Sequence, residues 1–223
     1  MAGGMKFPLV LLILISAAGL CRADFVIIQK VDSLGQSGQM TIMVNGDKIR
    51  ADISPQISTI TDARTGQVTT LMHEQKRYMV ISKGMFEQMA NVAMQGSTPP
   101  ATQPAPKATG KTDKINGYNA AEYTFSIGTI KGSYWMSTEF PNAKAVGDAL
   151  LKFQKGGLAN LAKSFAPDLT ALPGVPVKTV VEFNGQTTET DLVSAKEQAV
   201  DPAEYQVPAA YTEMKMPAMP PPQ

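Results

Sequence analysis

Cysteine and histidine, two residues on which much enzyme chemistry depends, are almost missing from this sequence. The 223 residues contain one cysteine, Cys21, and one histidine, His73. Metal sites built from several histidines or cysteines are therefore excluded, and any Ser-His or Cys-His mechanism would depend on a single residue. We interpret His73 as a solvated turn histidine, because it follows an expected strand and precedes Glu74 and Gln75. The sequence thus assigns no catalytic residue, no metal and no cofactor, and it favours a protein that is not an enzyme.

An excess of charge of either sign is also missing. The formal net charge is +1 at pH 7, and no cluster of basic residues stands out along the chain. Because a nucleic-acid partner requires a concentrated basic surface, the sequence predicts no nucleic-acid binding.

Long apolar runs are limited to the first residues. Lys6 precedes an apolar run from Phe7 to Leu20, and Cys21-Arg22-Ala23 follows it. This is the layout of a secretory signal peptide, here residues 1–23 with cleavage after Ala23, and the run is too short for a membrane span. An alternative is a lipid anchor on Cys21, although Leu20 is larger than the small residue that such signals place there. We expect an exported protein, periplasmic or secreted, without a membrane span and without cysteine in its mature form.

Strand-forming segments dominate the mature chain. In residues 47–53, Ile49, Ala51 and Ile53 alternate with charged residues, and Asn45-Gly46 precedes them as a hairpin signal. The other expected strands or hairpins lie at 25–31, 57–72, 77–82, 121–127, 130–137 and 177–195.

Helical spacing of apolar residues occurs in two regions, 85–95 and 142–165, the second interrupted by Gly156-Gly157. Hairpins require an antiparallel sheet, and amphipathic helices need its apolar face. The sequence therefore predicts an α+β fold, mainly β, in which a strongly curved antiparallel sheet (an incomplete barrel) wraps around two or three amphipathic helices.

Two proline-rich segments interrupt these patterns. Residues 96–111 have a composition that cannot bury a core, and we interpret them as a disordered loop. Residues 217–223 are expected to form a disordered tail. Each flank of the loop alone would leave an apolar sheet face uncovered, so residues 24–216 are expected to form one domain.

Methionine is unusually frequent, with 13 residues in the chain. Most of the methionines fall at the apolar phase of expected strands or helices, which leaves two interpretations open. They fill irregular gaps in a core, or they line a cavity that adapts to acyl chains. Tyr134 and Trp135 point to opposite faces of one strand, so at most one of them lines such a cavity.

Several short motifs resemble an uncharacterised family of exported bacterial proteins within the superfamily of LolA/LolB-type lipoprotein carriers. The resemblance implies an incomplete antiparallel barrel that encloses an apolar cavity, which in the carriers takes the acyl chains of lipoproteins. The residues that carry it are Lys48-Ile49-Arg50-Ala51-Asp52, Lys76-Arg77-Tyr78, Asn116-Gly117-Tyr118 with Ala121-Glu122-Tyr123, Tyr134-Trp135-Met136-Ser137, and Tyr205-Gln206-Val207-Pro208-Ala209-Ala210-Tyr211.

These observations favour an extracytoplasmic binding protein with a cavity for a lipid, an acyl chain or a lipidated partner. The oligomeric state is left open. The expected cavity-lining residues are Met40, Ile42, Met72, Met79, Met85, Phe86, Met89, Tyr134 and Met136.

Three alternatives stay open. The first is a structural or interaction module of the cell envelope with a filled core and no ligand. The second is a Cu(I) site in the tail, because thioethers such as those of Met214, Met216 and Met219 select Cu(I). The third is a hydrolase that uses paired carboxylates, for which the candidates are Glu122, Glu139, Glu182, Glu189 and Asp191.

Overall fold

The computed structural model describes residues 24–85, 88, 105–155, 167 and 169–215. Within these residues no helix is long and apolar enough to span a membrane. The signal-peptide prediction for residues 1–23 and the tail prediction for 217–223 lie outside the described part of the chain.

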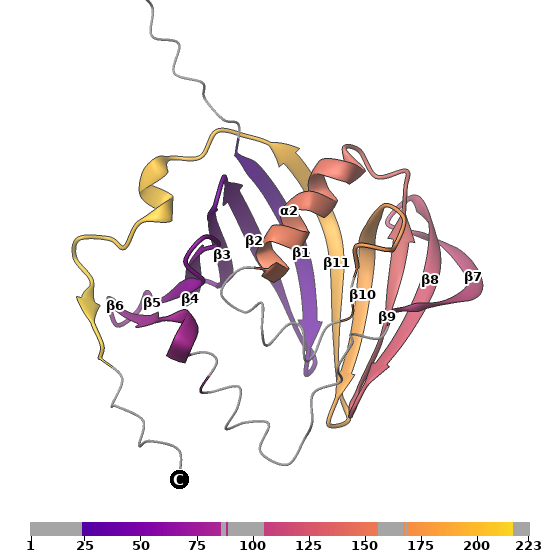
Figure 1. Ribbon diagram of the computed structural model, residues 1–223, viewed down its shortest axis with the longest axis horizontal. Coiled ribbons are helices and arrows are strands. Elements are labelled where there is room, and N and C mark those ends of the chain that lie inside the picture. The colour runs from indigo at the N-terminus through magenta and orange to yellow at the C-terminus, as the bar shows by residue number, and fades with distance from the viewer. Residues whose placement is uncertain (1–23, 86–87, 89–104, 156–166, 168, 216–223) are drawn as a thin grey trace, which may run out of the picture.

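One twelve-stranded sheet forms most of the described structure (Figure 1). Its strand order is β12-β6-β5-β4-β3-β2-β1-β11-β10-β9-β8-β7, and each neighbouring pair is antiparallel except β12 with β6. The strands are β1 (Phe25–Ser33), β2 (Gln36–Asn45), β3 (Lys48–Ser54), β4 (Ile57–Asp62), β5 (Gln67–Met72), β6 (Arg77–Ile81), β7 (Lys107–Ile115), β8 (Tyr118–Ile127), β9 (Ile130–Ser137), β10 (Val175–Phe183), β11 (Gln186–Glu197) and β12 (Thr212–Glu213).

Of the two hairpin turns that the sequence places at asparagine-glycine pairs, one is formed by that pair and the other is displaced by one residue. Asn184-Gly185 joins β10 to β11 with both residues at positive φ, as a two-residue turn that matches strand twist requires. The turn after β2 falls one residue later than predicted. Asn45 is still paired with Lys48, so Gly46 and Asp47 form the turn, and of the two only Gly46 has positive φ.

The main core lies between α2 (Ala143–Lys155) and one face of the sheet. Figure 1 shows the sheet curving around this helix, which crosses in front of β1 and β2. Val146 and Ala149 of α2 are buried against a cluster that includes Ile27 and Ile42 from the strands. The prediction of a mainly β fold with a strongly curved sheet is confirmed, and so is the helix that begins near residue 142. Residues 83–85 and 88 are helical, whereas the expected face at 158–165 lies outside the described residues.

Part of the segment predicted as a disordered loop is ordered, which corrects that prediction. Residues 107–111 belong to β7, which pairs with β8 at the edge of the sheet and is exposed along almost its whole length. The prediction was wrong because an edge strand is held by backbone hydrogen bonds on one side and needs no apolar side chains to bury. Gly110, at positive φ, accommodates the irregular register between Ala108 and Thr112.

The opposite face of β1 and β2 is covered by the segment after β11. We call residues 198–213 the C-terminal strap; it contains the short 3-10 helix η1 (Pro202–Tyr205) and β12. Tyr205 is buried with Val26 and Met43, which alternate with the core residues on the other face. In Figure 1 the strap runs from the end of β11 around the sheet to β6. Both faces of this part of the sheet are therefore covered.

Candidate functional site

A cavity of about 380 Å³ opens between α2 and the segment that leads into β10. Its walls come from the exposed side of α2, from the end of β9 and from residues 169–176. The lining residues are mainly apolar and include Met136, Leu150, Leu151, Leu169, Leu172 and Pro176. A volume of this size falls within the range of small-molecule pockets, near its lower end.

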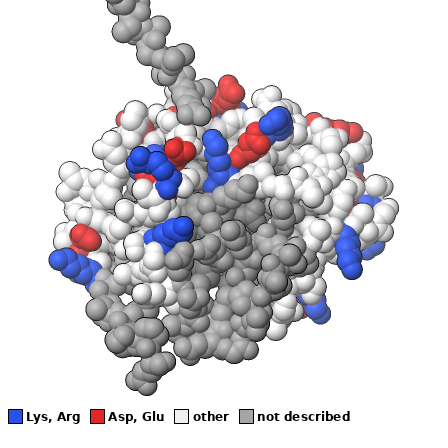
Figure 2. Space-filling view, in the orientation of Figure 1, with Lys and Arg blue, Asp and Glu red and all other residues white. Residues whose placement is uncertain are grey.

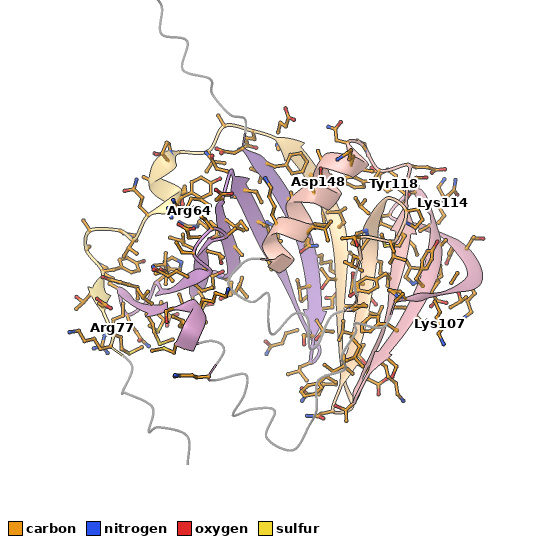
Figure 3. The ribbon with its side chains drawn as sticks, viewed as in Figure 1. Arg64, Arg77, Lys107, Lys114, Tyr118 and Asp148 are labelled. Atoms are coloured by element: carbon orange, nitrogen blue, oxygen red, sulfur yellow. The ribbon has the colours of Figure 1, made fainter. Side chains whose placement is uncertain are left out.

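Helix α2 leaves space for this cavity because one face carries apolar side chains that pack into the core, whereas the other face includes a glycine. Val146 and Ala149 are turned into the core, while Gly147 carries no side chain toward the cavity. Lys144 and Asp148 also line the cavity and form an ion pair of 2.8 Å one helical turn apart. The hydrogen bond to Asp148 raises the pKa of Lys144. The cavity therefore combines an apolar wall with an exposed pair of opposite charges; Figure 3 shows Asp148 on the helix.

The predicted cavity residues divide between this cavity and the filled core. Met136, which is 4% exposed, lines the cavity. Tyr134 lies in the same small cluster but stacks on Phe125 with ring centroids 5.1 Å apart, and burial raises the pKa of its phenol. Ile42 is buried in the main core, with Met40 packed against that core.

The other predicted cavity residues do not join this group. Met72 on β5, Met79 on β6 and Met85 after β6 are half-buried, away from the cavity lining. Phe86 and Met89 lie outside the described residues. The aliphatic residues that do line the cavity were missed, although the helical spacing around Leu150 and Leu151 could have indicated them.

A hydrogen-bonded polar network lies at the other end of the sheet, below the C-terminal strap. The carboxylate oxygen Asp52 Oδ1 accepts from Arg50 Nε at 2.7 Å and from Ser58 Oγ at 2.6 Å. Ser58 Oγ and His73 Nε2 are 2.7 Å apart, and His73 Nδ1 is 2.7 Å from the hydroxyl of Tyr211. The network thus joins β3, β4 and the end of β5 to the strap.

This network decides the tautomer of neutral His73. Ser58 gives its one hydroxyl proton to Asp52, so Nε2 of His73 must carry the proton that it donates to Ser58. Nδ1 then accepts from the hydroxyl of Tyr211. Interpreting His73 as a solvated turn histidine is therefore wrong: it is half-buried and bonded through both nitrogens, because a strap far away in sequence supplies Tyr211.

The pairing of Ser58 with His73 has the distance expected of a nucleophile and its base, but not the accessibility. Ser58 is 1% exposed and donates to a carboxylate rather than to the imidazole. A cleft of about 650 Å³ is lined by Arg50, Asp52, Ser58 and His73 of the network, together with other mostly polar residues such as Gln39, Thr41 and Ser54. The network acts as a structural connection between the sheet and the strap.

Three acidic residues meet on β1 and β11. Carboxylate oxygens of Asp32, Glu189 and Asp191 lie within 4.8 Å of one another. Lys30 pairs with Asp32 at 2.6 Å and Lys178 with Glu189 at 2.5 Å. The hydrogen bond from Lys30 lowers the pKa of Asp32, whereas a general acid needs a raised pKa.

The other candidate residues for a carboxylate hydrolase and for a Cu(I) site are described by the structure only in part. Glu139 accepts two hydrogen bonds from Asn119, and Glu122 pairs with Lys111 at 3.5 Å. In the tail, Met214 is half-buried, and Met216 and Met219 lie outside the described residues. Figure 2 shows acidic and basic side chains intermixed over the described part of the face that carries α2.

Comparisons with known proteins give a family and several distant structures. A family model, the domain of unknown function DUF4412, matches residues 27–211. No curated protein matches the sequence.

Three solved structures illustrate the distant matches. PNGF-II is 16% identical, with a TM-score of 0.41, and the match covers 86% of this chain and 31% of that one. The Pseudomonas aeruginosa MucA/MucB complex is 10% identical, with a TM-score of 0.43, and the match covers 90% of this chain and 63% of that one. A LolA superfamily protein from Nitrosomonas europaea is 9% identical, with a TM-score of 0.30, and the match covers 83% of this chain and 90% of that one. The chain thus spans about a third of PNGF-II and less than two thirds of the matched chain of the MucA/MucB complex, and likenesses this remote decide nothing about ligand or activity.

Proposed function

The chain belongs to the family of the domain of unknown function DUF4412, and we propose that it is an extracytoplasmic binding protein that holds an apolar ligand in the cavity beside α2. The ligand class is a lipid, an acyl chain or the acyl group of a lipidated partner. Export through residues 1–23 is part of this proposal. No catalytic step belongs to it.

The observation that carries the proposal is the aliphatic wall of the cavity. Leu150 and Leu151 on α2, together with Leu169 and Leu172, line a space of about 380 Å³. Burial of an acyl chain contributes about 0.8 kcal/mol for each methylene removed from water. Burial of about ten methylenes would therefore contribute about 8 kcal/mol, the equivalent of micromolar affinity before the cost of association is subtracted, and specific polar contacts are not required.

The charged pair beside the cavity supports a ligand with a polar end. Lys144 is 90% exposed at its side chain and Asp148 is 57% exposed, so both can contact solvent and a bound headgroup. An ammonium group attracts phosphate or carboxylate, whereas Asp148 keeps the local charge balanced. We propose that the acyl part lies against the leucines and the polar part near Lys144.

A ligand-free interaction module is the second candidate, and the packing of the sheet favours it. Ile42 is buried in the main core and Tyr134 stacks on Phe125, so two of the expected cavity residues instead fill space. In that case the cavity beside α2 is a packing gap and takes no ligand.

Mass spectrometry of residues 24–223, purified without detergent from an extracytoplasmic compartment, separates the two candidates. We expect a native mass that exceeds the chain mass by a stoichiometric lipid or acylated molecule, released after solvent extraction. A clean mass together with failure to take up palmitic acid would contradict the binding proposal and favour the interaction module.

A matched pair of variants locates the site. Leu151→Trp places a large ring in the cavity without removing a residue of the main core cluster, and it should reduce palmitic acid uptake about tenfold or more, which corresponds to about 1.4 kcal/mol. Leu34→Trp makes the same change in the β1–β2 turn, where the side chain is 68% exposed, and should leave uptake unchanged. Equal uptake by the two variants would place the ligand elsewhere.

A further inference from the structure

The polar cleft that contains His73 is a second candidate binding site, separate from the cavity beside α2. Its volume of about 650 Å³ is within the range of small-molecule sites, and it shares no lining residue with that cavity. The walls come from β2, from β3 and the turn after it, from β4 and from the end of β5. Every lining residue except Gly38 and Pro55 has a polar or charged side chain, so the cleft does not suit an apolar ligand.

Hydrogen bonds within the protein hold part of this lining in one arrangement. Asp52 Oδ1 accepts from Arg50 Nε and from Ser58 Oγ, and Ser58 is bonded in turn to His73. The C-terminal strap holds both ends of this chain of bonds, because it contacts Arg50 and His73. Side chains that are already ordered lose little further freedom when a ligand binds, which favours affinity.

Three side chains of the cleft have hydrogen-bonding capacity that these internal bonds do not use. Both bonds to the Asp52 carboxylate go to Oδ1, and this side chain is 33% exposed, so Oδ2 is able to accept from a ligand. Gln39 is exposed and Thr41 is half-buried, and neither side chain bonds to another residue in the described part of the chain. An amide and a hydroxyl each both donate and accept.

The backbone of β2 adds donors and acceptors along the same cleft. Strand β3 pairs with β2 only from Thr41 onward, so the earlier residues of β2 have a strand neighbour on the β1 side alone. The two-residue turn makes Ser33 and Gln36 a bonded pair, and bonded and non-bonded pairs then alternate. The backbone groups of Ser37 and Gln39 therefore face the open side. Strands usually have about 5–6 residues, so this short edge suits a small ligand better than an added strand.

The charges at the cleft favour a neutral ligand. The side chain of Arg50 is 12% exposed and is paired with Asp52 at 2.7 Å and with Glu204 at 2.7 Å. An anion would meet the Asp52 carboxylate while the guanidinium is already engaged, and a metal cation would meet that guanidinium beside one carboxylate. A neutral ligand with many hydroxyl groups avoids both repulsions and matches the mixture of donors and acceptors.

We propose that this cleft binds a neutral saccharide, whose hydroxyl groups donate to Asp52 Oδ2 and bond to Gln39, Thr41 and the open edge of β2. Asp52 is the main contact, because a hydrogen bond to an ionised carboxylate is stronger than one between neutral groups. The strap helps to form the site by holding Arg50 and His73 in place. This inference goes beyond the proposed function and depends neither on the apolar ligand nor on export.

Amide NMR spectra of residues 24–223 locate the binding directly. The protein is titrated with maltotriose, chitotriose, mannotriose and galactobiose as neutral probes, and with inorganic phosphate as an anionic one. We expect at least one saccharide to shift the backbone amides of Ser37, Gln39 and Thr41 and the side-chain amide of Gln39. The backbone amide of Gly147, which lines the cavity beside α2, should stay unchanged. Phosphate should shift none of these signals.

Asp52→Asn tests the main contact with a small change to the internal bonds. The amide oxygen of the new side chain is able to accept from Arg50 and Ser58 as Oδ1 does, whereas its NH2 group replaces Oδ2 and turns an acceptor into a donor. The affinity for the bound saccharide should fall about tenfold or more, because the hydroxyl that donates to Oδ2 loses its partner.

Gln39→Ala and Gln186→Ala form a matched pair on exposed strand residues. The first removes one neutral hydrogen-bonding group from the cleft and should reduce the affinity about fivefold. The second makes the same change beside the β10–β11 turn, away from the cleft lining, and should leave the affinity unchanged. Because the side chain of Gln39 is exposed, this pair keeps the test valid even if Asp52→Asn does not fold.

Unchanged spectra with all of these saccharides would overturn the proposal, and so would equal affinities of Gln39→Ala and Gln186→Ala. Larger shifts with phosphate than with any saccharide would also overturn it and would identify an anion site instead. The result is independent of the palmitic acid measurement. Saccharide binding without uptake of palmitic acid would contradict the proposal for the cavity beside α2 and support the one made for the cleft.

Discussion

Single residues with unusual backbone angles determine where the cavity wall begins. Gly174 lies immediately before β10 at φ +75° and packs on the end of β9. A Cβ atom at this position would lie 2.0 Å from the carbonyl oxygen of Ser137 and 2.8 Å from the backbone nitrogen of Thr138. No side chain can be accommodated there unless β9 and β10 separate.

Gly174→Ala is expected to lower the free energy of unfolding by about 2–4 kcal/mol, because it adds a clash with backbone to a strained φ. Gly147→Ala on α2 is the matched control. Its Cβ would lie 3.7 Å from Gly174 and Val175, an ordinary contact, and a helix interior gains about 0.5–1 kcal/mol from this change. Urea unfolding of both variants provides the measurement. Equal free energies of unfolding for the two variants would show that this turn is not rigid.

Among the helices, strands and their contacts, the sequence predicts those that depend on neighbouring residues. It misses the contacts between segments that are distant in the chain. The Asn184-Gly185 hairpin and helix α2 follow from local turn chemistry and apolar spacing. The strap contacts do not, because Arg50 bonds to Glu204 across 154 residues and His73 to Tyr211 across 138. Nothing local to His73 indicates that a tyrosine will cover it.

The position of the cavity likewise could not be predicted from the sequence. Alternation and spacing identify Met136 as an inward residue, but they do not tell a filled core from an open cavity. That difference depends on how α2 lies against residues 169–176, a packing result that no single segment encodes. Ile42 and Tyr134 have the same pattern as Met136 and fill space.

The β4–β5 hairpin provides a pH-dependent prediction. The hydrogen bond from Lys48 first, and then the N–H groups of Arg64 and Thr65, lower the pKa of Asp62 to about 2. Its folded pKa is below the unfolded value near 3.9, so its contribution is present above pH 4 and is lost as the pH falls toward about 2.

The denaturation midpoint of Asp62→Asn should therefore lie below that of the unchanged protein at pH 5, and the gap should close toward pH 2. Asp148→Asn, which breaks an exposed pair on α2, is the control and should change the midpoint little. A gap for Asp62→Asn that stays constant over this pH range would mean that charge on Asp62 does not hold the hairpin.

The whole molecule is an open sheet, so it has two edges to protect from pairing with another chain. At one edge β7 is exposed and carries Lys107, Lys111 and Lys114, which discourage a further strand. Figure 3 shows Lys107 and Lys114 at this end and Arg77 of β6 at the opposite end. There β12 covers β6, with Thr212 donating to the carbonyl of Lys76 and Met214 to that of Tyr78.

Removing β12 should therefore turn the β6 edge into a pairing site. A chain that ends at Tyr211 keeps the hydroxyl that bonds to His73 but exposes the carbonyls of Lys76 and Tyr78, and we expect it to associate with itself as its concentration rises. A chain that ends at Lys215 keeps β12 and is the control. Analytical ultracentrifugation of the two over the same concentrations measures the effect. Identical sedimentation would show that the edge of β6 is protected by its own side chains, and that the strap acts on the face of the sheet rather than on its edge.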